Sequence, residues 1–145
     1  MTPSAPAYDP DNIFAKILRG ELPCHKVYED DKSLAFMDIM PRVDGHTLIV
    51  PNAPSRNILD IAPADLQHLI LVTQKIARAA KEAFQADGVI ISQFSERAAG
   101  QVVFHTHFHV LPRREGFEMR PPGIKADNAV IAEHAKMLAD AIAKG

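Results

Sequence analysis

The segment from Val103 to Leu111 places a histidine at every second position between residues 105 and 109. Successive side chains of a β-strand point to opposite faces, so this period of two predicts a strand over residues 103–111. One face of that strand carries His105, His107 and His109, and the other carries Phe104, Thr106, Phe108 and Val110. We expect the second face to pack under a helix and the histidine face to line a concave site.

The spacing of the three histidines separates two chemical uses. At about 3.3 Å per residue, His105 and His109 lie roughly 13 Å apart along a strand. That span is too long for all three imidazoles to ligate one zinc ion at bonds of about 2 Å without a sharp bend. His107 has an imidazole on each side, which suits a nucleophile whose pKa is lowered by its neighbours and by burial. A solvent-facing histidine strand and a metal-binding patch are the alternatives.

The rest of the pattern predicts an α+β fold. Helical spacing covers residues 11–19, with Asp11 as the N-cap and Gly20 as the stop, residues 63–86, with Gly88 just beyond the end, and residues 128–143. Turn residues bound five short strands, expected at residues 25–29, 33–39, 46–51, 89–94 and 103–111. Strands that follow one another directly favour an antiparallel sheet of about five strands with a long helix on one face.

Composition limits the class of protein. The chain of 145 residues is one domain's worth, and we divide it into a flexible tail (1–10), a main domain (11–114) and a C-terminal extension with a helix (115–145). Its 16 basic and 18 acidic residues give a net charge of −2, which argues against nucleic-acid binding. Cys24 is the one cysteine, and we find neither a secretory signal nor a membrane-spanning run. A cytoplasmic location is expected.

These features resemble the histidine triad (HIT) family, whose signature is His-x-His-x-His followed by apolar residues. The resemblance covers residues 11–114. Besides the triad it includes five blocks in the family's order: Asn12-Ile-Phe-Ala-Lys-Ile-Leu-Arg-Gly-Glu-Leu-Pro23, Val27-Tyr-Glu-Asp-Asp31, Leu34-Ala-Phe-Met-Asp-Ile39, Gly45-His-Thr-Leu-Ile-Val-Pro51 and Ala99-Gly-Gln101.

The resemblance implies a nucleotide-binding hydrolase that acts at the α-phosphate of a purine nucleotide, such as a nucleoside phosphoramidate, with no cofactor. It implies that His107 is the nucleophile that becomes transiently nucleotidylated, and that His109 is the partner of the phosphate or leaving group. His105 is implied to support them, and His46 matches a fourth histidine beside the triad. The resemblance also implies a homodimer.

Further positions match the substrate-binding residues of the family. Asp38 matches the ribose-binding acid, and a carboxylate can accept hydrogen bonds from both ribose hydroxyls. Gly100 and Gln101 match a segment that approaches the phosphate, where glycine permits close backbone approach and the amide supplies a donor. The apolar wall on which the base lies is matched by Ile13, Phe14, Ile17 and Ile39.

The sequence departs from the family pattern at three places. Val102 stands where many members have a serine or threonine that donates toward the leaving group, so leaving-group activation is in question. Residues 94–97 lack the asparagine that many members carry. Asn12 and Ala15 stand where some bacterial members have the Cys-x-x-Cys pair of a structural zinc site, so we expect no metal.

Two other functions fit the same residues. One is cleavage of dinucleoside polyphosphates. The other is a nucleotide-binding or partner-binding protein with little turnover, for which Val102 argues. The transferase branch of the family usually has glutamine in place of the third histidine. Because His109 is present here, the resemblance favours hydrolysis over nucleotide transfer.

Overall fold

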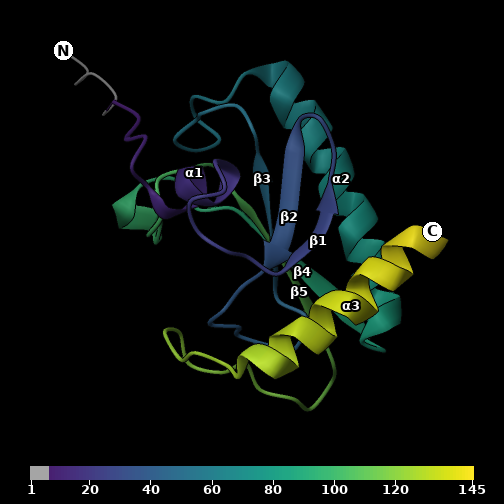
Figure 1. Cartoon of the computed structure of the whole chain (residues 1–145). Helices are drawn as coiled ribbons and strands as arrows, with labels where there is room; N and C mark the ends of the chain where they lie inside the picture. The colour runs from purple at the N-terminus through teal and green to yellow at the C-terminus, as the bar shows by residue number, and fades with distance from the viewer. Residues whose placement is uncertain (1–6) are drawn as a thin grey trace.

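The computed structural model describes residues 7–145 and contains an antiparallel five-stranded sheet (Figure 1). The strands are β1 (Lys26–Glu29), β2 (Ser33–Met37), β3 (Thr47–Pro51), β4 (Gly88–Ser92) and β5 (Phe108–Arg113). They are ordered β1-β2-β3-β5-β4, and every neighbouring pair is antiparallel. The helices are α1 (Ile13–Leu18), α2 (Pro63–Ala83) and α3 (Asn128–Lys144), with a short 3-10 turn at Arg97–Ala99. The expected α+β architecture is confirmed.

Helices cover the two faces of the sheet unequally (Figure 1). The long helices α2 and α3 pack on one face, which we call the helix face, over a core that includes Ile49, Ile76 and Leu138. The short helix α1 packs on the other face, the α1 face, where Phe14 joins a smaller core with Leu48. His109 pairs with Leu48 across β5 and β3, so its side chain also lies on the α1 face. In the described part of the chain, no helix is both long enough and apolar enough to cross a membrane.

Helix ends differ from the expectation in their capping residues. Asn12, not Asp11, caps α1, because its side-chain oxygen accepts a hydrogen bond from the Ala15 N–H at 2.9 Å. After α2 the chain reverses through Gln85, which adopts a left-handed φ of 51°. Gly88 was expected to fill that role, but it is the first residue of β4.

The strand expected over residues 103–111 begins only at Phe108 and continues to Arg113, so this prediction was wrong at both ends. The backbone before Phe108 is irregular because its hydrogen bonds go to the loop after β3. The Thr106 N–H donates to the Ser55 carbonyl at 2.9 Å, and the two hydroxyls are 2.6 Å apart. His105 and His107 therefore lie on a bend that leads into β5, and only His109 belongs to the strand.

The apolar side chains of this segment behave as expected only in the strand itself. Phe108 and Val110 are buried in the core of the helix face. Phe104 is half-buried outside that core, with the guanidinium of Arg56 4.1 Å from its ring centroid. The alternation of side chains between two faces that predicted one continuous strand is therefore present within β5 and absent from the residues before it.

Gly45 fixes the start of β3, one residue before His46. Its φ is +88°, and a Cβ there would lie 2.7 Å from the Phe84 ring and 2.9 Å from Pro112. Only glycine fits this close approach of the backbone to the end of α2 and to β5. The glycine therefore lets the chain enter β3 with His46, the residue just before the strand, beside His109.

Candidate active site

His107 is held with one ring nitrogen committed and the other free of hydrogen-bond partners among the described residues. Its Nδ1 lies 2.7 Å from the His105 carbonyl oxygen. A carbonyl only accepts, so Nδ1 carries the proton and Nε2 of the neutral ring keeps its lone pair. The Phe14 ring meets the imidazole edge-on, with centroids 4.8 Å apart, and fixes the ring plane. The arrangement leaves Nε2 as a nucleophilic atom.

His109 has the opposite tautomer, which is set through His46. The backbone N–H of Arg42 donates to His46 Nδ1 at 3.0 Å, so the proton of the neutral His46 ring is on Nε2. That atom lies 2.9 Å from His109 Nδ1 and donates to it. His109 therefore presents Nε2–H as a donor. Its ring centroid is 4.9 Å from that of His107, so a ring with a free lone pair and a ring with a free N–H donor are neighbours.

His105 is buried next to His107 and is held by two hydrogen bonds. It is 1% exposed, and its Nε2 lies 2.8 Å from the Pro51 carbonyl oxygen, to which it donates. Its Nδ1 accepts a hydrogen bond from the Tyr8 hydroxyl at 2.5 Å. Both ring nitrogens of His105 are thus engaged within the protein.

Burial keeps the histidines of the site neutral. Burial lowers the pKa of His107 below its ordinary value, against the opposing hydrogen bond to the His105 carbonyl. The pKa of His105 is lowered to about 4, mainly by burial. Burial, with the proximity of His107 and His46, lowers the pKa of His109 to about 3. Burial also lowers the pKa of His46, although the Asp38 carboxylate opposes the shift. Neutral imidazoles are the nucleophilic form at pH 7.

Asp38 joins this group from the end of β2. One carboxylate oxygen accepts the Met40 N–H at 2.8 Å, and the other lies 3.5 Å from His46 Nε2. The second oxygen keeps free acceptor capacity at a partly exposed position. Of the residues expected to form the apolar wall, Phe14 is buried and Ile17 packs on the small core. Ile13 and Ile39 are 54% and 45% exposed, so they are not core residues.

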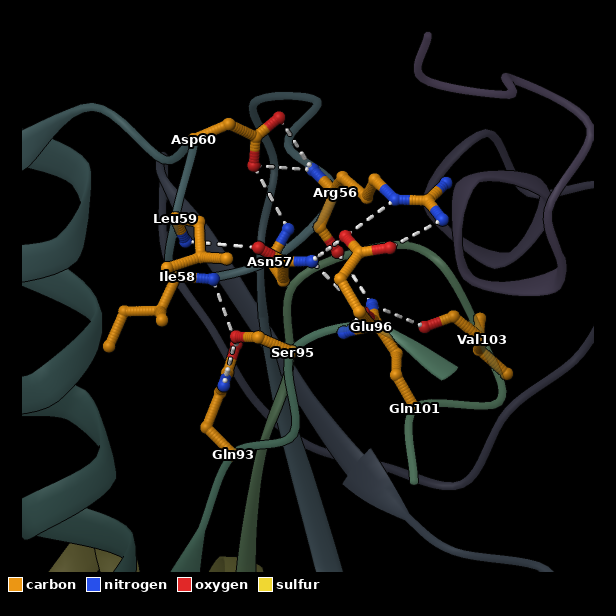
Figure 2. Close-up of polar contacts among 10 residues, drawn as sticks. All are labelled: Arg56, Asn57, Ile58, Leu59, Asp60, Gln93, Ser95, Glu96, Gln101 and Val103. Carbon is orange, nitrogen blue, oxygen red and sulfur yellow. Dashed lines mark hydrogen bonds and ion pairs between the residues drawn. The ribbon is translucent and has the colours of Figure 1, made fainter. Parts of the chain in front are cut away.

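Gln101 has a different role from the expected one. Its side-chain N–H groups donate to the Arg56 carbonyl at 2.7 Å and the Val103 carbonyl at 3.1 Å. Its side-chain oxygen accepts from Asn57 and from the Glu96 N–H, as Figure 2 shows. The amide is therefore consumed inside the loop and is not a free donor for a phosphate. Gln101 instead holds the segment that leads into the histidines.

The same network fixes the backbone of Glu96 (Figure 2). Glu96 has a left-handed φ of 76°, a strained conformation for this residue type. Arg56 holds its carboxylate through two hydrogen bonds of 2.9 Å, and Asn57 adds one of 2.7 Å. After a short turn, Gly100 takes a φ of +100°, which glycine adopts without strain. The loop before the triad is thus built rigidly.

Asp38, His46 and His109 also form a group with metal-ligand chemistry, since their candidate ligand atoms lie within 4.8 Å of one another. The hydrogen bonds oppose that use, because His46 has Nδ1 engaged by the Arg42 N–H and Nε2 protonated and donating to His109, which leaves His46 no free lone pair for an ion. At the other candidate position, Asn12 caps α1 and Ala15 has no ligand atom. The residues present there do not fit a zinc site built on two cysteines.

Three groups of the site escaped the sequence analysis. Tyr8 lies in the segment predicted to be a flexible tail. The described part of that segment, from residue 7, places Tyr8 on His105, and its first six residues lie outside the described residues. Phe94 contacts His109 with ring centroids 5.4 Å apart. Arg42 acts through its backbone N–H, which no side-chain pattern reveals. An aromatic residue in a proline-rich segment was the one available signal, and it was weak.

Comparisons with known proteins agree with the fold and with the family resemblance. The family model described as HIT domain matches residues 19–116. A crystal structure of a Hit-like protein from Bartonella henselae is 49% identical, with a TM-score of 0.88, and the match covers 93% of this chain and 99% of that one. A histidine triad nucleotide-binding protein from Sulfolobus tokodaii is 32% identical, with a TM-score of 0.85 and coverage of 90% and 91%.

A curated relative carries a named activity. The adenylylsulfatase HINT3 of Arabidopsis thaliana is 38% identical over 105 residues, which are 72% of this chain and 53% of that protein. The fold, the order of the histidines and these matches define one class of protein. The chain belongs to the HIT family.

Proposed function

We propose that this protein is a nucleotide hydrolase that cleaves at the α-phosphate of nucleoside phosphoramidates or related purine nucleotides. The observation that carries the proposal is the pair of opposed tautomers on neighbouring rings, since His107 has a free Nε2 and His109 has a free Nε2–H. A nucleophile and a donor on adjacent imidazoles are the two groups that phosphoryl substitution needs.

In the first step, His107 Nε2 attacks the α-phosphorus and forms a P–N bond as the bond to the leaving group breaks. An amine leaving group must take up one proton as it departs. The His46–His109 pair supplies this proton, because a bound phosphate and the nearby Asp38 carboxylate both favour protonation of the pair. The products are a nucleotidyl-histidine and a free amine.

In the second step, water attacks the same phosphorus. The P–N bond to His107 breaks, His107 leaves as a neutral imidazole, and the proton of the water returns to the His46–His109 pair. The product is a nucleoside monophosphate. The hydrogen bond from His107 Nδ1 to the His105 carbonyl favours the positive charge that the ring carries as an intermediate.

The substrate class rests on Asp38, on the exposed apolar residues and on the family. The free carboxylate oxygen of Asp38 suits ribose hydroxyls, and exposed Ile13 and Ile39 suit the face of a base. Among the relatives, one is named as a nucleotide-binding protein and one as an adenylylsulfatase. The first name describes nucleotide binding and the second a hydrolytic activity, and both support the proposal.

Mass spectrometry tests the proposed intermediate directly. The protein is mixed with adenosine 5′-phosphoramidate, quenched during turnover, and analysed intact and after digestion. We expect a mass increase of one adenylyl group, located on His107, together with release of adenosine monophosphate. The variant His107→Asn should give neither adduct nor product.

The same assay separates the competing functions. Dinucleoside polyphosphates in place of the phosphoramidate test the alternative hydrolase. Tight nucleotide binding with no adduct and no product from either substrate class would overturn the proposal and identify a binding protein. Val102 favours that outcome, since it is 84% exposed and offers no donor at a position where many HIT proteins have one.

We also propose that a second copy of this chain pairs along β4. This strand forms an edge of the sheet and exposes Ile90 and Ile91 at 38% and 41%. An exposed apolar edge strand is open to pairing with another strand. Light scattering after size-exclusion chromatography should give a dimer mass, and Ile91→Lys should shift it to a monomer. A monomeric wild-type chain at micromolar concentration would contradict this.

A further inference from the structure

The residues that precede α1 are fastened to the domain. The Arg19 side chain donates to the Pro10 carbonyl at 2.7 Å. The Asp9 carbonyl accepts from the Asn12 side chain at 2.8 Å, and the Asp9 carboxylate accepts from the Asp11 N–H at 2.9 Å. These contacts fix the backbone on the C-terminal side of Tyr8.

Tyr8 extends from this segment to His105. Its hydroxyl oxygen lies 2.5 Å from His105 Nδ1, and the two rings meet edge-on with centroids 5.7 Å apart. His105 Nε2 already donates to the Pro51 carbonyl, so Nδ1 of the neutral ring is the acceptor and the tyrosine is the donor. Burial raises the pKa of Tyr8, which keeps its hydroxyl protonated.

The contact continues to the nucleophile through the backbone of the same histidine. The His105 carbonyl accepts from His107 Nδ1–H at 2.7 Å, and this hydrogen bond sets the tautomer that frees Nε2. The position of His105 therefore determines the position of His107. Its ring is held on one side by Pro51 and on the other by Tyr8.

We propose that Tyr8 is a positioning residue of the active site, whose hydroxyl locks the His105 ring and thereby holds the His105 carbonyl on His107. Removing the hydroxyl leaves Nδ1 of a buried ring without a partner, which is unfavourable. The ring then rotates or admits water, and the carbonyl of the same residue loses its fixed position. The kinetic test of this proposal rests on the proposed hydrolase function. The spectroscopic test does not depend on that function.

The chain offers a matched control, because it has two tyrosines. Tyr28 also donates a hydroxyl hydrogen bond, at 2.8 Å to Asp30, but it packs against the core of the helix face. Tyr8→Phe and Tyr28→Phe therefore remove the same group from the two faces. Tyr8→Ala removes the ring as well, which separates the hydrogen bond from the edge-on ring contact.

The first measurement is steady-state hydrolysis of adenosine 5′-phosphoramidate. We expect Tyr8→Phe to lower kcat about fivefold, the effect of one typical hydrogen bond, and to leave KM within about twofold. Tyr8→Ala should lower kcat further. Tyr28→Phe should keep the kcat of the wild type. Equal kcat values for Tyr8→Phe and Tyr28→Phe, after correction for the folded fraction, would overturn the proposal.

The second measurement does not depend on turnover. Long-range nitrogen–proton correlation spectra report the tautomer of each histidine. In the wild type we expect His105 as the Nε2–H form and His107 as the Nδ1–H form. Tyr8→Phe should move or broaden the His105 and His107 nitrogen signals, whereas Tyr28→Phe should leave them in place. Unchanged nitrogen signals in Tyr8→Phe would overturn the proposal even if the protein proved to have no hydrolase activity.

Discussion

Histidines on the two faces of the sheet have different partners. On the helix face, His68 lies 2.9 Å from the Asp30 carboxylate, and His134 packs edge-on against Phe84 with centroids 5.3 Å apart. On the α1 face, the partners of His105 and His107 are carbonyls and a hydroxyl, and His46 and His109 bond to each other. The hydrogen bonds to carbonyls, to a hydroxyl and between His46 and His109 fix the neutral tautomers of the α1-face rings. The two faces therefore differ in how firmly the tautomer of each ring is set.

Asp30, the carboxylate partner of His68, has a strongly lowered pKa. Burial opposes ionisation of this carboxyl, but hydrogen bonds from Lys32, Tyr28, Ser33 and His68 outweigh it and hold the pKa well below its usual range. A carboxyl with a lowered pKa stabilises the fold above its ordinary pKa, and the contribution is lost as the pH falls. The charge there closes the turn between β1 and β2.

The largest expected effect comes from replacing His107, the proposed nucleophile, with asparagine. The same replacement of His134 on the helix face serves as its control. His107→Asn should lower kcat by at least about 10³-fold, because the covalent route is lost. Nucleotide affinity, measured by calorimetry, should stay within about tenfold of the wild type, since His107 acts in the chemical step.

His134→Asn is the matched control on the helix face and should keep the kcat of the wild type. If His107→Asn and His134→Asn lost activity equally, the histidines of the two faces would not differ in their importance for catalysis. Loss of nucleotide affinity together with activity in His107→Asn would instead give that residue a structural role.

The second effect is on stability and belongs to the helix face. Leu138 is fully buried between α3 and the sheet. Leu138→Ala should lower the free energy of unfolding by about 2–5 kcal/mol, because it leaves a cavity in a packed core. The kcat of the folded fraction should not change. Urea denaturation followed by assay below the unfolding transition checks both, and a large loss of kcat would show that the faces are coupled.

The sequence predicts the helix face well and the approach to the site less well. The patterns of apolar and turn residues located α2, α3 and the first four strands to within a few residues, because packing on one face imposes regular spacing. Residues 103–107 also alternate, but their backbone bonds to the loop at Ser55. Periodicity records which side chains alternate and does not record which backbone groups pair. The start of β5 was therefore missed.

Within the site, the alternating histidines could be recognised from the sequence, whereas their tautomers could not. The residue types and spacing of His105, His107 and His109 predicted a nucleophile flanked by helpers. The protonation of each ring depends on contacts with Pro51, Tyr8 and the Arg42 backbone, which are distant in the sequence. The expected donor, Gln101, is consumed by carbonyls that only the folded loop brings to it.

The third effect is a pH dependence that the α1 face alone should produce. Neutral His107 is the attacking form in the proposed reaction, and burial lowers its pKa, so kcat/KM should show no loss as the pH falls through 6.5 and should decline only at lower pH. The unfolded chain binds protons on these histidines below about pH 6.5, whereas the folded chain does not.

The linked effect on stability follows from the same pKa values. The pKa of His105 is lowered to about 4 and that of His109 to about 3, so each should cost about 1.4 kcal/mol of unfolding free energy per pH unit between about pH 6 and 4.5. Denaturation and kinetics at several pH values check both trends. An acid limb centred on pH 6.5 would mean that the rings are not held neutral by burial.

The smallest effect concerns the donor side of the α1 face. Among the donors described above, His109 Nε2–H is the one left free to meet a leaving group, because the amide of Gln101 is engaged and Val102 has no donor. Val102 is 84% exposed, so Val102→Ser removes little packing and adds a hydroxyl. If one hydrogen bond to the leaving group forms, turnover of substrates with poor leaving groups should rise about two- to tenfold.

Val102→Ala controls for the loss of the side chain and should leave turnover unchanged. Equal rates for the serine and alanine variants would mean that His109 already supplies all the donation that the leaving group uses.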